Sequence, residues 1–135
     1  MSDECLFCSI AAGAIPARIV GESAGAMAFL DINPAGTGHT LVIPRTHATD
    51  IWDLAPDDAD EVWRLSQRTA DRLRQVLEPE GLTIFQANGK AGWQEGFHFH
   101  VHLVPRWRGD GLTKPWHGTP GDPAELDALA KRLNP

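Results

Sequence analysis

Three histidines occupy every second position in the segment GFHFHVHLVPR, residues 96–106: His98, His100 and His102. The chain has six histidines in 135 residues, so half of them fall within this one segment. Near neutral pH an imidazole can bind a metal, shuttle a proton, attack phosphorus or donate a hydrogen bond to a phosphate oxygen. The spacing therefore predicts either a metal centre with three histidine ligands or a phosphate site. A solvated sheet face that carries histidines by chance is the third reading.

The loop before the histidines has the composition of an anion-binding segment. NGKAGWQEG, residues 88–96, is rich in glycine and also offers the side-chain amide of Gln94. Glycine allows the backbone to approach an oxyanion closely, and successive backbone N–H groups can form a concavity that binds anions. The loop thus favours phosphate chemistry over a three-histidine metal centre.

The two cysteines of the chain, Cys5 and Cys8, have the spacing C-x-x-C. The first residues, MSDECLFC, have neither the basic region nor the apolar stretch of a secretory signal, so we expect a cytoplasmic protein. A structural disulfide is not expected in that compartment. From the spacing alone, a zinc site, a redox pair and chance remain equally open.

Composition limits the partners. A net charge of −6 and a pI of about 5.4 argue against a broad electrostatic contact with nucleic acid or an anionic membrane. A small phosphate ligand is still compatible, because a few local donors can hold it. No apolar run approaches the roughly 20 residues of a membrane span. With 42% hydrophobic and 22% charged residues and no internal repeat, the chain is expected to be one soluble domain, residues 1–135.

The scaffold that must position the histidines is predicted to contain five strands. We expect them at 17–23, 26–31, 39–44, 81–87 and 97–104. Pro105 is expected to end the last strand. Because alternate side chains of a strand share a face, the three histidines should lie on one side, with the residues between them facing the core. Those core-facing residues are Phe97, Phe99, Val101 and Leu103.

Three helices are expected. The long one covers 56–77, where Pro56 suits the first helical position and apolar residues recur every three or four positions. A brief helix at about 4–13 should carry both cysteines, and a last helix at 123–133 should begin at the N-cap Asp122. Its apolar stripe consists of Leu126, Leu129, Ala130 and Leu133. Without regular βαβ alternation, this order predicts an α+β fold with an antiparallel sheet.

The sequence resembles the histidine-triad (HIT) superfamily, whose motif is His-x-His-x-His-x-x with hydrophobic x. Here x is Phe99, Val101, Leu103 and Val104. Three further stretches resemble the family in the same order: CLFCSIAAGAIPARIV, FLDINPAGTGHTLVIPRTH and QANGKAGWQEGFHFHVHLVPRWRGDG. The resemblance covers nearly the whole chain. It implies a HIT-like fold with about five antiparallel strands, one long helix and short terminal helices.

The resemblance also implies a division of labour. His100 would be the nucleophile that attacks the α-phosphorus of a purine nucleotide derivative and forms a nucleotidyl-histidine. His102 would bind the same phosphate, and His39 and Gln94 match further residues of the phosphate site. The positions matched to nucleotide contacts also include Phe29, Asp31, Ile32 and Asn88. Taken without its motif, Asp31 would be only a turn residue before Asn33.

For His98 the resemblance implies a different role. In family members with an N-terminal C-x-x-C, the first triad histidine binds zinc rather than substrate. Its partners here would be Cys5, Cys8 and His47. Two sulfur and two nitrogen ligands make a closed tetrahedral structural site.

Three positions depart from the family pattern. Trp93 replaces the glycine that usually precedes the loop glutamine, Gly96 stands where valine is common, and Ala87 stands where Asn or Gln is common, although Asn88 follows it. Trp93 fits a lid over the nucleotide and a surface packing residue equally well. These departures fall in the phosphate loop, so the sequence does not predict which leaving group the protein prefers.

We therefore expect a hydrolase or nucleotidyl transferase that acts on a phosphoramidate or a dinucleoside polyphosphate. The alternatives are a non-catalytic protein that binds or senses purine nucleotides, and a zinc-stabilised interaction module. The resemblance implies a homodimer, and a five-stranded sheet leaves an edge to protect.

Overall fold

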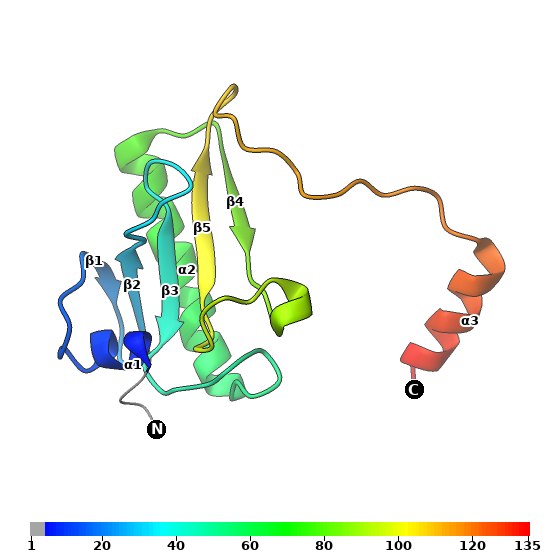
Figure 1. The fold of residues 1–135 in the computed structure, drawn as a ribbon, viewed down its shortest axis with the longest axis horizontal. Coiled ribbons are helices and arrows are strands. Elements are labelled where there is room, and N and C mark those ends of the chain that lie inside the picture. Colours follow the sequence, from blue (N-terminus) through cyan, green and yellow to red (C-terminus); the bar gives the residue numbers. More distant parts are fainter. Residues whose placement is uncertain (1–4) are drawn as a thin grey trace.

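The computed structural model describes residues 5–135, which form one five-stranded antiparallel sheet in the order β1-β2-β3-β5-β4 (Figure 1). The strands are β1 (Ile19–Glu22), β2 (Ala26–Leu30), β3 (Thr40–Pro44), β4 (Gly81–Phe85) and β5 (Val101–Arg106). The helical elements are α1 (Leu6–Ala11), α2 (Pro56–Leu77), the 3₁₀ turn η2 (Lys90–Gly92) and α3 (Pro123–Leu133). This arrangement confirms the α+β fold. Residue 4, where the sequence places the start of the first helix, lies outside the described residues.

Helix α2 covers one face of the sheet. Its bounds are those predicted, and Val62 and Leu65 are buried against Val42, Phe99 and Leu103 of the sheet side. Ala55 provides no side-chain cap, so the start of the helix depends on Pro56 in the first turn. Burial of this apolar stripe fixes the register of β3 and β5, because a one-residue shift would turn their apolar side chains away from α2.

The opposite face of the sheet is covered in part by α1. Ile10 and Phe7 of this short helix pack on Phe29, Leu41 and other apolar residues of β2 and β3. Alternate residues of β3 therefore point to opposite layers. The histidines of the triad lie on the α1 side, since Phe7 contacts the rings of both His98 and His100.

The prediction for the last strand is wrong at both ends. The chain bends at residues 96–98, and β5 begins only at Val101. Before it, the Phe99 N–H group donates to the carbonyl of Ala48, 2.6 Å away, in the segment after β3. Phe97 is exposed rather than in the core, whereas Phe99 and Leu103 are buried as expected.

Pro105 lies within β5 instead of ending it. The ladder between β3 and β5 stops at the pair Thr40–Leu103, and the Arg106 carbonyl accepts from Glu80 on the β4 side. Because successive backbone groups of a strand alternate in direction, the nitrogen of Pro105 points to the side where no ladder bond remains. Its missing N–H group therefore costs no hydrogen bond.

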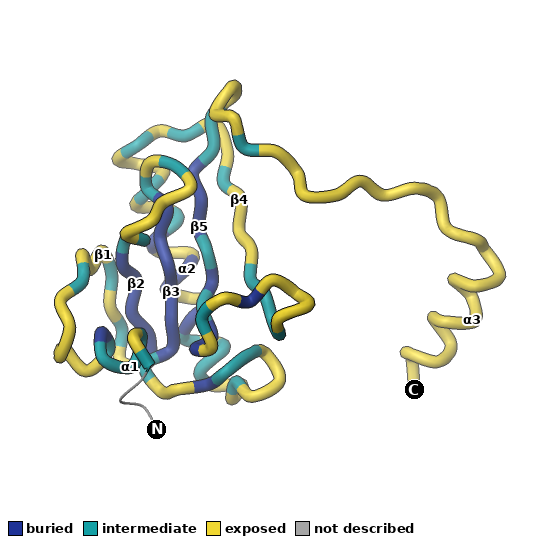
Figure 2. The backbone as a smooth tube through the Cα atoms, viewed as in Figure 1, coloured by how far each residue is buried: buried dark blue, intermediate teal, exposed yellow. Residues whose placement is uncertain are grey.

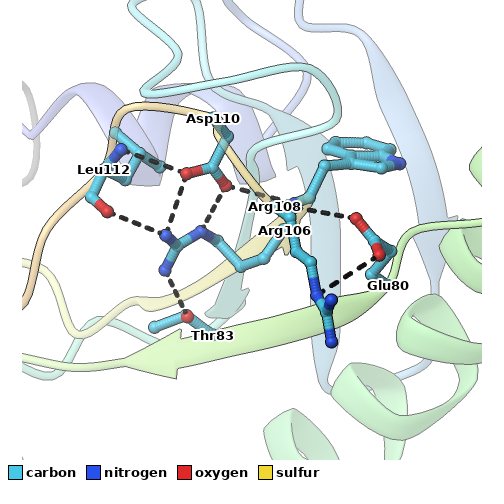
Figure 3. Close-up of polar contacts among 7 residues, drawn as sticks. Glu80, Thr83, Arg106, Arg108, Asp110 and Leu112 are labelled. Atoms are coloured by element: carbon cyan, nitrogen blue, oxygen red, sulfur yellow. Dashed lines mark hydrogen bonds and ion pairs between the residues drawn. The ribbon is translucent and has the colours of Figure 1, made fainter.

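The C-terminal segment leaves the body of the molecule after β5 (Figure 1). Arg106 holds the turn that follows: its guanidinium donates to both carboxylate oxygens of Asp110 and to the carbonyl of Leu112 (Figure 3). The Arg106 guanidinium in turn lowers the pKa of the Asp110 carboxyl. Arg108 reaches Glu80 and is largely solvated, so both arginines serve the turn in this structure.

Beyond the turn, residues 113–135 are all exposed (Figure 2). Helix α3 begins as predicted, with the Asp122 side chain accepting from the Glu125 N–H group. Its apolar stripe, however, is not buried. A single domain over residues 1–135 stays a prediction. None of the helices in residues 5–135 combines the length and apolar character needed to cross a membrane.

Candidate active site and metal centre

The backbone selects one tautomer of the His100 ring. Its Nδ1 lies 2.8 Å from the carbonyl oxygen of His98. A carbonyl can only accept, so in the neutral ring Nδ1 carries the proton and Nε2 keeps its lone pair. In that tautomer the half-buried His100 presents Nε2 as the nitrogen with the lone pair, which a nucleophile requires.

A second hydrogen-bond chain fixes His102. The backbone N–H of Ala35 donates to His39 Nδ1 over 2.9 Å, so the proton of His39 is on Nε2. That proton points to His102 Nδ1, also 2.9 Å away. His102 is thereby left with its own proton on Nε2, as a hydrogen-bond donor next to His100. The two rings are 4.8 Å apart between centroids.

The environment keeps these rings neutral. Burial, and then the neighbouring His100 and His39, lower the pKa of His102 to about 3. Burial also lowers the pKa of His39, against the opposing effect of Asp31. Neutral imidazoles are consistent with the tautomers just assigned, because a protonated His102 could not accept from His39.

Two phenylalanines support the pair, and the sequence did not point to either. Phe85 of β4 stacks on His102, with 4.0 Å between centroids and an interplanar angle of 7°. Phe7 of α1 makes an edge contact with His100 at 5.2 Å. Their roles depend on strand pairing, in which Phe85 lies opposite His102, and on the docking of α1. No local pattern in the sequence encodes these two relationships.

Asp31 lies beside the same histidine chain, and Ile32 follows it in the sequence. One carboxylate oxygen of Asp31 accepts from the Asn33 N–H group, which is the turn role expected for it alone. The other lies 3.6 Å from His39 Nε2, which places the carboxylate beside the histidine chain. Ile32 is exposed and free to contact a ligand, whereas Phe29 is only 3% exposed and packs under Phe7.

The structure places the amide of Gln94 inside the loop that precedes the triad. Gln94 is 3% exposed. Its Nε2 donates to the carbonyls of Thr49 and Gly96, and its Oε1 accepts from the Gly89 N–H group. Both amide hydrogens are used, so the side chain has no donor left for a phosphate in this state.

Asn88 is engaged in a similar way. Its Oδ1 accepts from the backbone N–H of Ile51, and its side chain exchanges two hydrogen bonds with Gln86. The two amides thus join the loop to residues 49–51, after β3. Neither is brought into hydrogen-bond contact with the histidine chain.

Trp93, the residue that departs from the family pattern, is 60% exposed and has a positive φ of 76°. It contacts Trp116 of the C-terminal segment, with 5.2 Å between ring centroids. A Cβ atom added at Gly96 would make ordinary contacts with His100 and Phe7, so this glycine is not required by crowding.

The second cluster consists of Cys5, Cys8, His47 and His98, whose ligand atoms all lie within 4.8 Å of one another. Cys5 is the N-cap of α1 and Cys8 lies one turn later, so the helix brings the two sulfurs together. His47 follows β3, and His98 precedes β5. Both cysteines are free thiols.

The spacing of these atoms fits a tetrahedral zinc ion. Bond lengths of about 2.3 Å to sulfur and 2.0–2.1 Å to nitrogen place tetrahedral S and N ligands roughly 3.6 Å apart and two N ligands roughly 3.3 Å apart. The sulfur–nitrogen distances are 3.4 Å for Cys5–His98, 3.5 Å for Cys8–His98 and 3.3 Å for Cys8–His47. The two Nδ1 atoms of His47 and His98 are 3.3 Å apart.

A backbone partner orients His98 for this role. Its Nε2 donates to the carbonyl of Pro44 over 2.8 Å, which leaves the Nδ1 lone pair directed at the cysteines. Burial and then the adjacent Cys5 raise the pKa of Cys8 to about 11. A divalent cation would reverse this shift, because it stabilises the thiolate. The geometry and the donor set therefore suit zinc.

The cluster of Asp31, His39 and His102 is also rich in potential ligands. The facing nitrogens of His39 and His102 are 2.9 Å apart, closer than the roughly 3.3 Å expected for two nitrogens on one zinc ion. Their separation is that of a hydrogen bond. This cluster is therefore better described as a proton-ordering chain than as a metal centre.

Comparison with known proteins relates the chain to one family. A family model described as the HIT domain matches residues 12–109. The chain is 37% identical to "Protein hit" of Bacillus subtilis, over 98% of this chain and 96% of that protein. It is 33% identical to an adenosine 5'-monophosphoramidase of Schizosaccharomyces pombe, over 96% of each chain.

One of the similar solved structures is that of a zinc-bound protein. The crystal structure of a zinc-bound histidine triad family protein from Mycobacterium smegmatis superposes with a TM-score of 0.78 at 37% identity. The alignment covers 99% of this chain and 98% of that one. This chain thus shares its fold with a zinc-bound relative, and its own Cys5, Cys8, His47 and His98 could hold a metal ion.

Proposed function

The chain belongs to the HIT domain family, and from that premise we propose that it is a hydrolase or nucleotidyl transferase acting on the α-phosphorus of a purine nucleotide derivative. The substrate class is a nucleoside phosphoramidate or a dinucleoside polyphosphate. The observation that carries the proposal is the bond from His100 Nδ1 to the His98 carbonyl, because it leaves Nε2 free to attack. The similarity to an adenosine 5'-monophosphoramidase supports it.

The proposed reaction has two steps. His100 Nε2 attacks the α-phosphorus, forming a P–N bond while the bond to the leaving amine or phosphate breaks and the leaving group takes up a proton. Water then attacks the same phosphorus, which breaks the bond to His100 and releases the nucleoside monophosphate. If another acceptor replaces water, the same intermediate gives nucleotidyl transfer.

His102 would stabilise the charge that develops on the phosphate. With its proton on Nε2, it can donate to a non-bridging oxygen without itself becoming charged. His39 acts through His102 by fixing that tautomer, so it is a positioning residue. Phe85 keeps the ring of His102 in place by stacking.

For the nucleoside we propose Ile32 as a contact of the base and Asp31 as the acceptor for the ribose hydroxyls. Ile32 is exposed beside the site, and Asp31 keeps one oxygen out of its turn. We revise the roles of three other matched residues. Gln94 and Asn88 brace the phosphate loop through their amide bonds, and Phe29 supports Phe7 from within the core.

We propose zinc as a structural cofactor, held by Cys5, Cys8, His47 and His98. A closed site with four protein ligands has no open position for substrate. Bound there, the ion would tie α1 to the ends of β3 and β5, which carry the histidines. Its chemical contribution would be to keep the two cysteines as thiolates and to stabilise the fold.

The test is turnover of adenosine 5'-phosphoramidate and of diadenosine polyphosphates by the zinc-loaded protein. Release of AMP from at least one of these is expected. If none turns over while AMP raises the melting temperature, the protein is a nucleotide-binding protein rather than an enzyme. If none turns over and AMP does not raise the melting temperature either, the protein is a zinc-stabilised interaction module instead.

We further propose that the protein is a homodimer that pairs through β4. This strand is an edge of the sheet, and Ile84 and Phe85 on it are exposed apolar residues. Edge strands of this kind tend to pair with another chain. Light scattering at micromolar concentration should give twice the chain mass of 14.7 kDa.

The cytoplasmic location also stays a prediction, which cell fractionation would check.

A further inference from the structure

Helix α1 contributes residues to both clusters of the molecule. Cys5 and Cys8, one turn apart, belong to the metal cluster, and Phe7 between them touches the histidine proposed as nucleophile. The ring centroid of Phe7 lies 5.2 Å from that of His100 and 5.8 Å from that of His98. A change in the bonds of the two sulfurs therefore acts on a helix that also contacts the active site.

The two sulfurs are also placed to bond to each other. They lie within 4.8 Å, and the Cys8 N–H group donates to the Cys5 sulfur over 3.3 Å. The Cα atoms of residues three apart in a helix are roughly 5 Å apart, which is within the range of disulfides. A bond between these cysteines therefore needs no movement of a distant element. The chain has no third cysteine that could compete for either of them.

The metal cluster is open to solvent on one side. His47 is exposed and both cysteines are half-buried, whereas His98 is only 1% exposed. A small polar oxidant can therefore reach the sulfurs from the side of His47. Cysteines that bind a metal are thiolates, and the thiolate is the form that peroxides oxidise. A zinc site with this open side is thus also a site where oxidation can occur.

We propose that Cys5 and Cys8 are a peroxide-sensitive pair, whose oxidation to a disulfide releases the metal and loosens Phe7 from His100. The inference rests on the zinc site proposed above and adds a reversible regulation to it. Both sulfur ligands are lost together, and two histidines alone do not make the four-ligand site of a structural zinc ion. The oxidant is a hydroperoxide, and the reductant that restores the site is a dithiol.

The oxidation consumes one peroxide molecule per chain. One thiolate attacks the peroxide, so that an S–O bond forms, the O–O bond breaks and hydroxide leaves. The second thiolate then attacks the same sulfur. The S–S bond forms and the S–O bond breaks with loss of a second hydroxide. In total the two sulfurs lose two electrons, which reduce the peroxide, and the zinc ion is released unchanged.

Loss of the metal weakens the attachment of α1 to the sheet. The helix has only six residues, and helices this short depend on tertiary contacts. The metal would tie it to His47 and His98. Without that tie, only the packing of Phe7 and Ile10 on apolar residues of β2 and β3 remains. The ring of His100 then has a looser neighbour, and its attack on phosphorus should slow because a reacting group must be held in position.

The first experiment follows the sulfurs. Zinc-loaded protein receives about one equivalent of hydrogen peroxide per chain, and a chromogenic chelator measures the zinc released. Most of the zinc should leave, and mass spectrometry should find the peptide that contains Cys5 and Cys8 two hydrogens lighter. A dithiol with added zinc should reverse both changes. Retention of zinc, sulfonic acids, or disulfides between chains as the main products would each overturn the proposal.

The control for this experiment is Cys8→Ser. The variant keeps one sulfur and cannot form the internal disulfide, so peroxide should leave it without the loss of two hydrogens. The same loss in Cys8→Ser would show that the mass change in the wild type does not report a bond between Cys5 and Cys8, and would overturn the assignment.

The second experiment tests whether Phe7 transmits the change. Oxidation should raise the hydrogen–deuterium exchange of residues 6–11 and lower the kcat for a phosphoramidate about tenfold or more. Phe7→Leu should keep its zinc and release it to peroxide as the wild type does. Its kcat should already be low in the zinc-loaded form, and oxidation should lower it much less. An equal fold-change in the two proteins would exclude Phe7 as the positioning residue.

The zinc site and its oxidation fail in different ways. A protein that purifies without zinc would overturn both. Zinc that is present and stays bound in peroxide would overturn the oxidation alone. If no phosphoramidate turns over, the proposed reaction fails, while zinc release and the exchange of residues 6–11 still decide the fate of this inference.

Discussion

His39 Nε2 donates a hydrogen bond to His102 Nδ1 over 2.9 Å, and this bond leaves the proton of His102 on Nε2. His39 is itself fixed by the N–H group of Ala35. A backbone donor thus sets the proton position of a side chain two steps away. The account of catalysis proposed above depends on this order of protons.

Replacing His39 should lower turnover without abolishing binding. In His39→Leu the partner of His102 Nδ1 is lost, so His102 can adopt the other tautomer and cease to donate to the phosphate. Loss of one oriented donor of this kind costs about 10²–10³-fold in kcat, and KM should change much less. His117→Asn, in the exposed C-terminal segment, is the control. Equal kinetics for the two variants would remove His39 from the mechanism.

The free energy of unfolding should decrease as the pH is lowered, because of His102. Its pKa in the folded protein is about 3, below the ordinary value of 6.5, so the unfolded chain binds more protons between these values. The contribution is therefore fully present above about pH 6.5 and is lost as the pH falls toward 3. Urea unfolding at pH 7 and pH 5 should show a smaller loss for His102→Gln than for the wild type. An equal loss in both proteins would contradict the assigned direction.

The loop brace predicts a specific effect of Gln94. Replacing it with Leu removes bonds to Thr49, Gly89 and Gly96 and leaves these backbone groups unpaired. The loop before His100 should then loosen, with a loss of about 1–3 kcal/mol in stability and a fall in kcat. Glu95→Gln changes an exposed neighbour and should be neutral. Wild-type stability and kcat in the Gln94→Leu protein would contradict the prediction that the amide hydrogen bonds stabilise the loop.

Zinc should be present at about one ion per chain and should be needed for stability. His47→Ala removes one ligand of the cluster, and a loss of about 3 kcal/mol would lower the melting temperature of a chain this size by roughly 10 °C. Elemental analysis and calorimetry check both statements. A protein that purifies without zinc and is indifferent to chelator would contradict the structural role.

The sequence predicted most of the scaffold because local patterns encode it. Helix α2 has its predicted bounds, since Pro56 and the apolar period mark it, and the cap Asp122 starts α3 where expected. The last strand was predicted to begin too early, because the alternation of histidine and apolar residues continues through the bend at residues 96–98. There, His98 lies beside the cysteines and the Phe99 N–H group bonds to the Ala48 carbonyl, so these residues do not pair as a strand.

The site was predicted less completely than the fold. The alternation of His98, His100 and His102 was enough to place the histidines on one face. It could not show that Phe85 stacks on His102, because that contact follows from the pairing of β4 with β5. Nor could it show that the amide of Gln94 turns into its own loop. Such contacts depend on distant chain segments meeting, which no local spacing records.

The most direct test of the account compares His100 with His98, two residues apart on the chain. The wild-type protein is mixed with an adenosine phosphoramidate and quenched within the first turnover, and its peptides are weighed by mass spectrometry under conditions that preserve P–N bonds. The account predicts one adenylyl group on His100. It also predicts that His100→Asn abolishes turnover while keeping zinc and nucleotide affinity within about tenfold, whereas His98→Ala loses zinc. An adduct on another residue, near-native turnover in His100→Asn, or loss of zinc from both variants would contradict it.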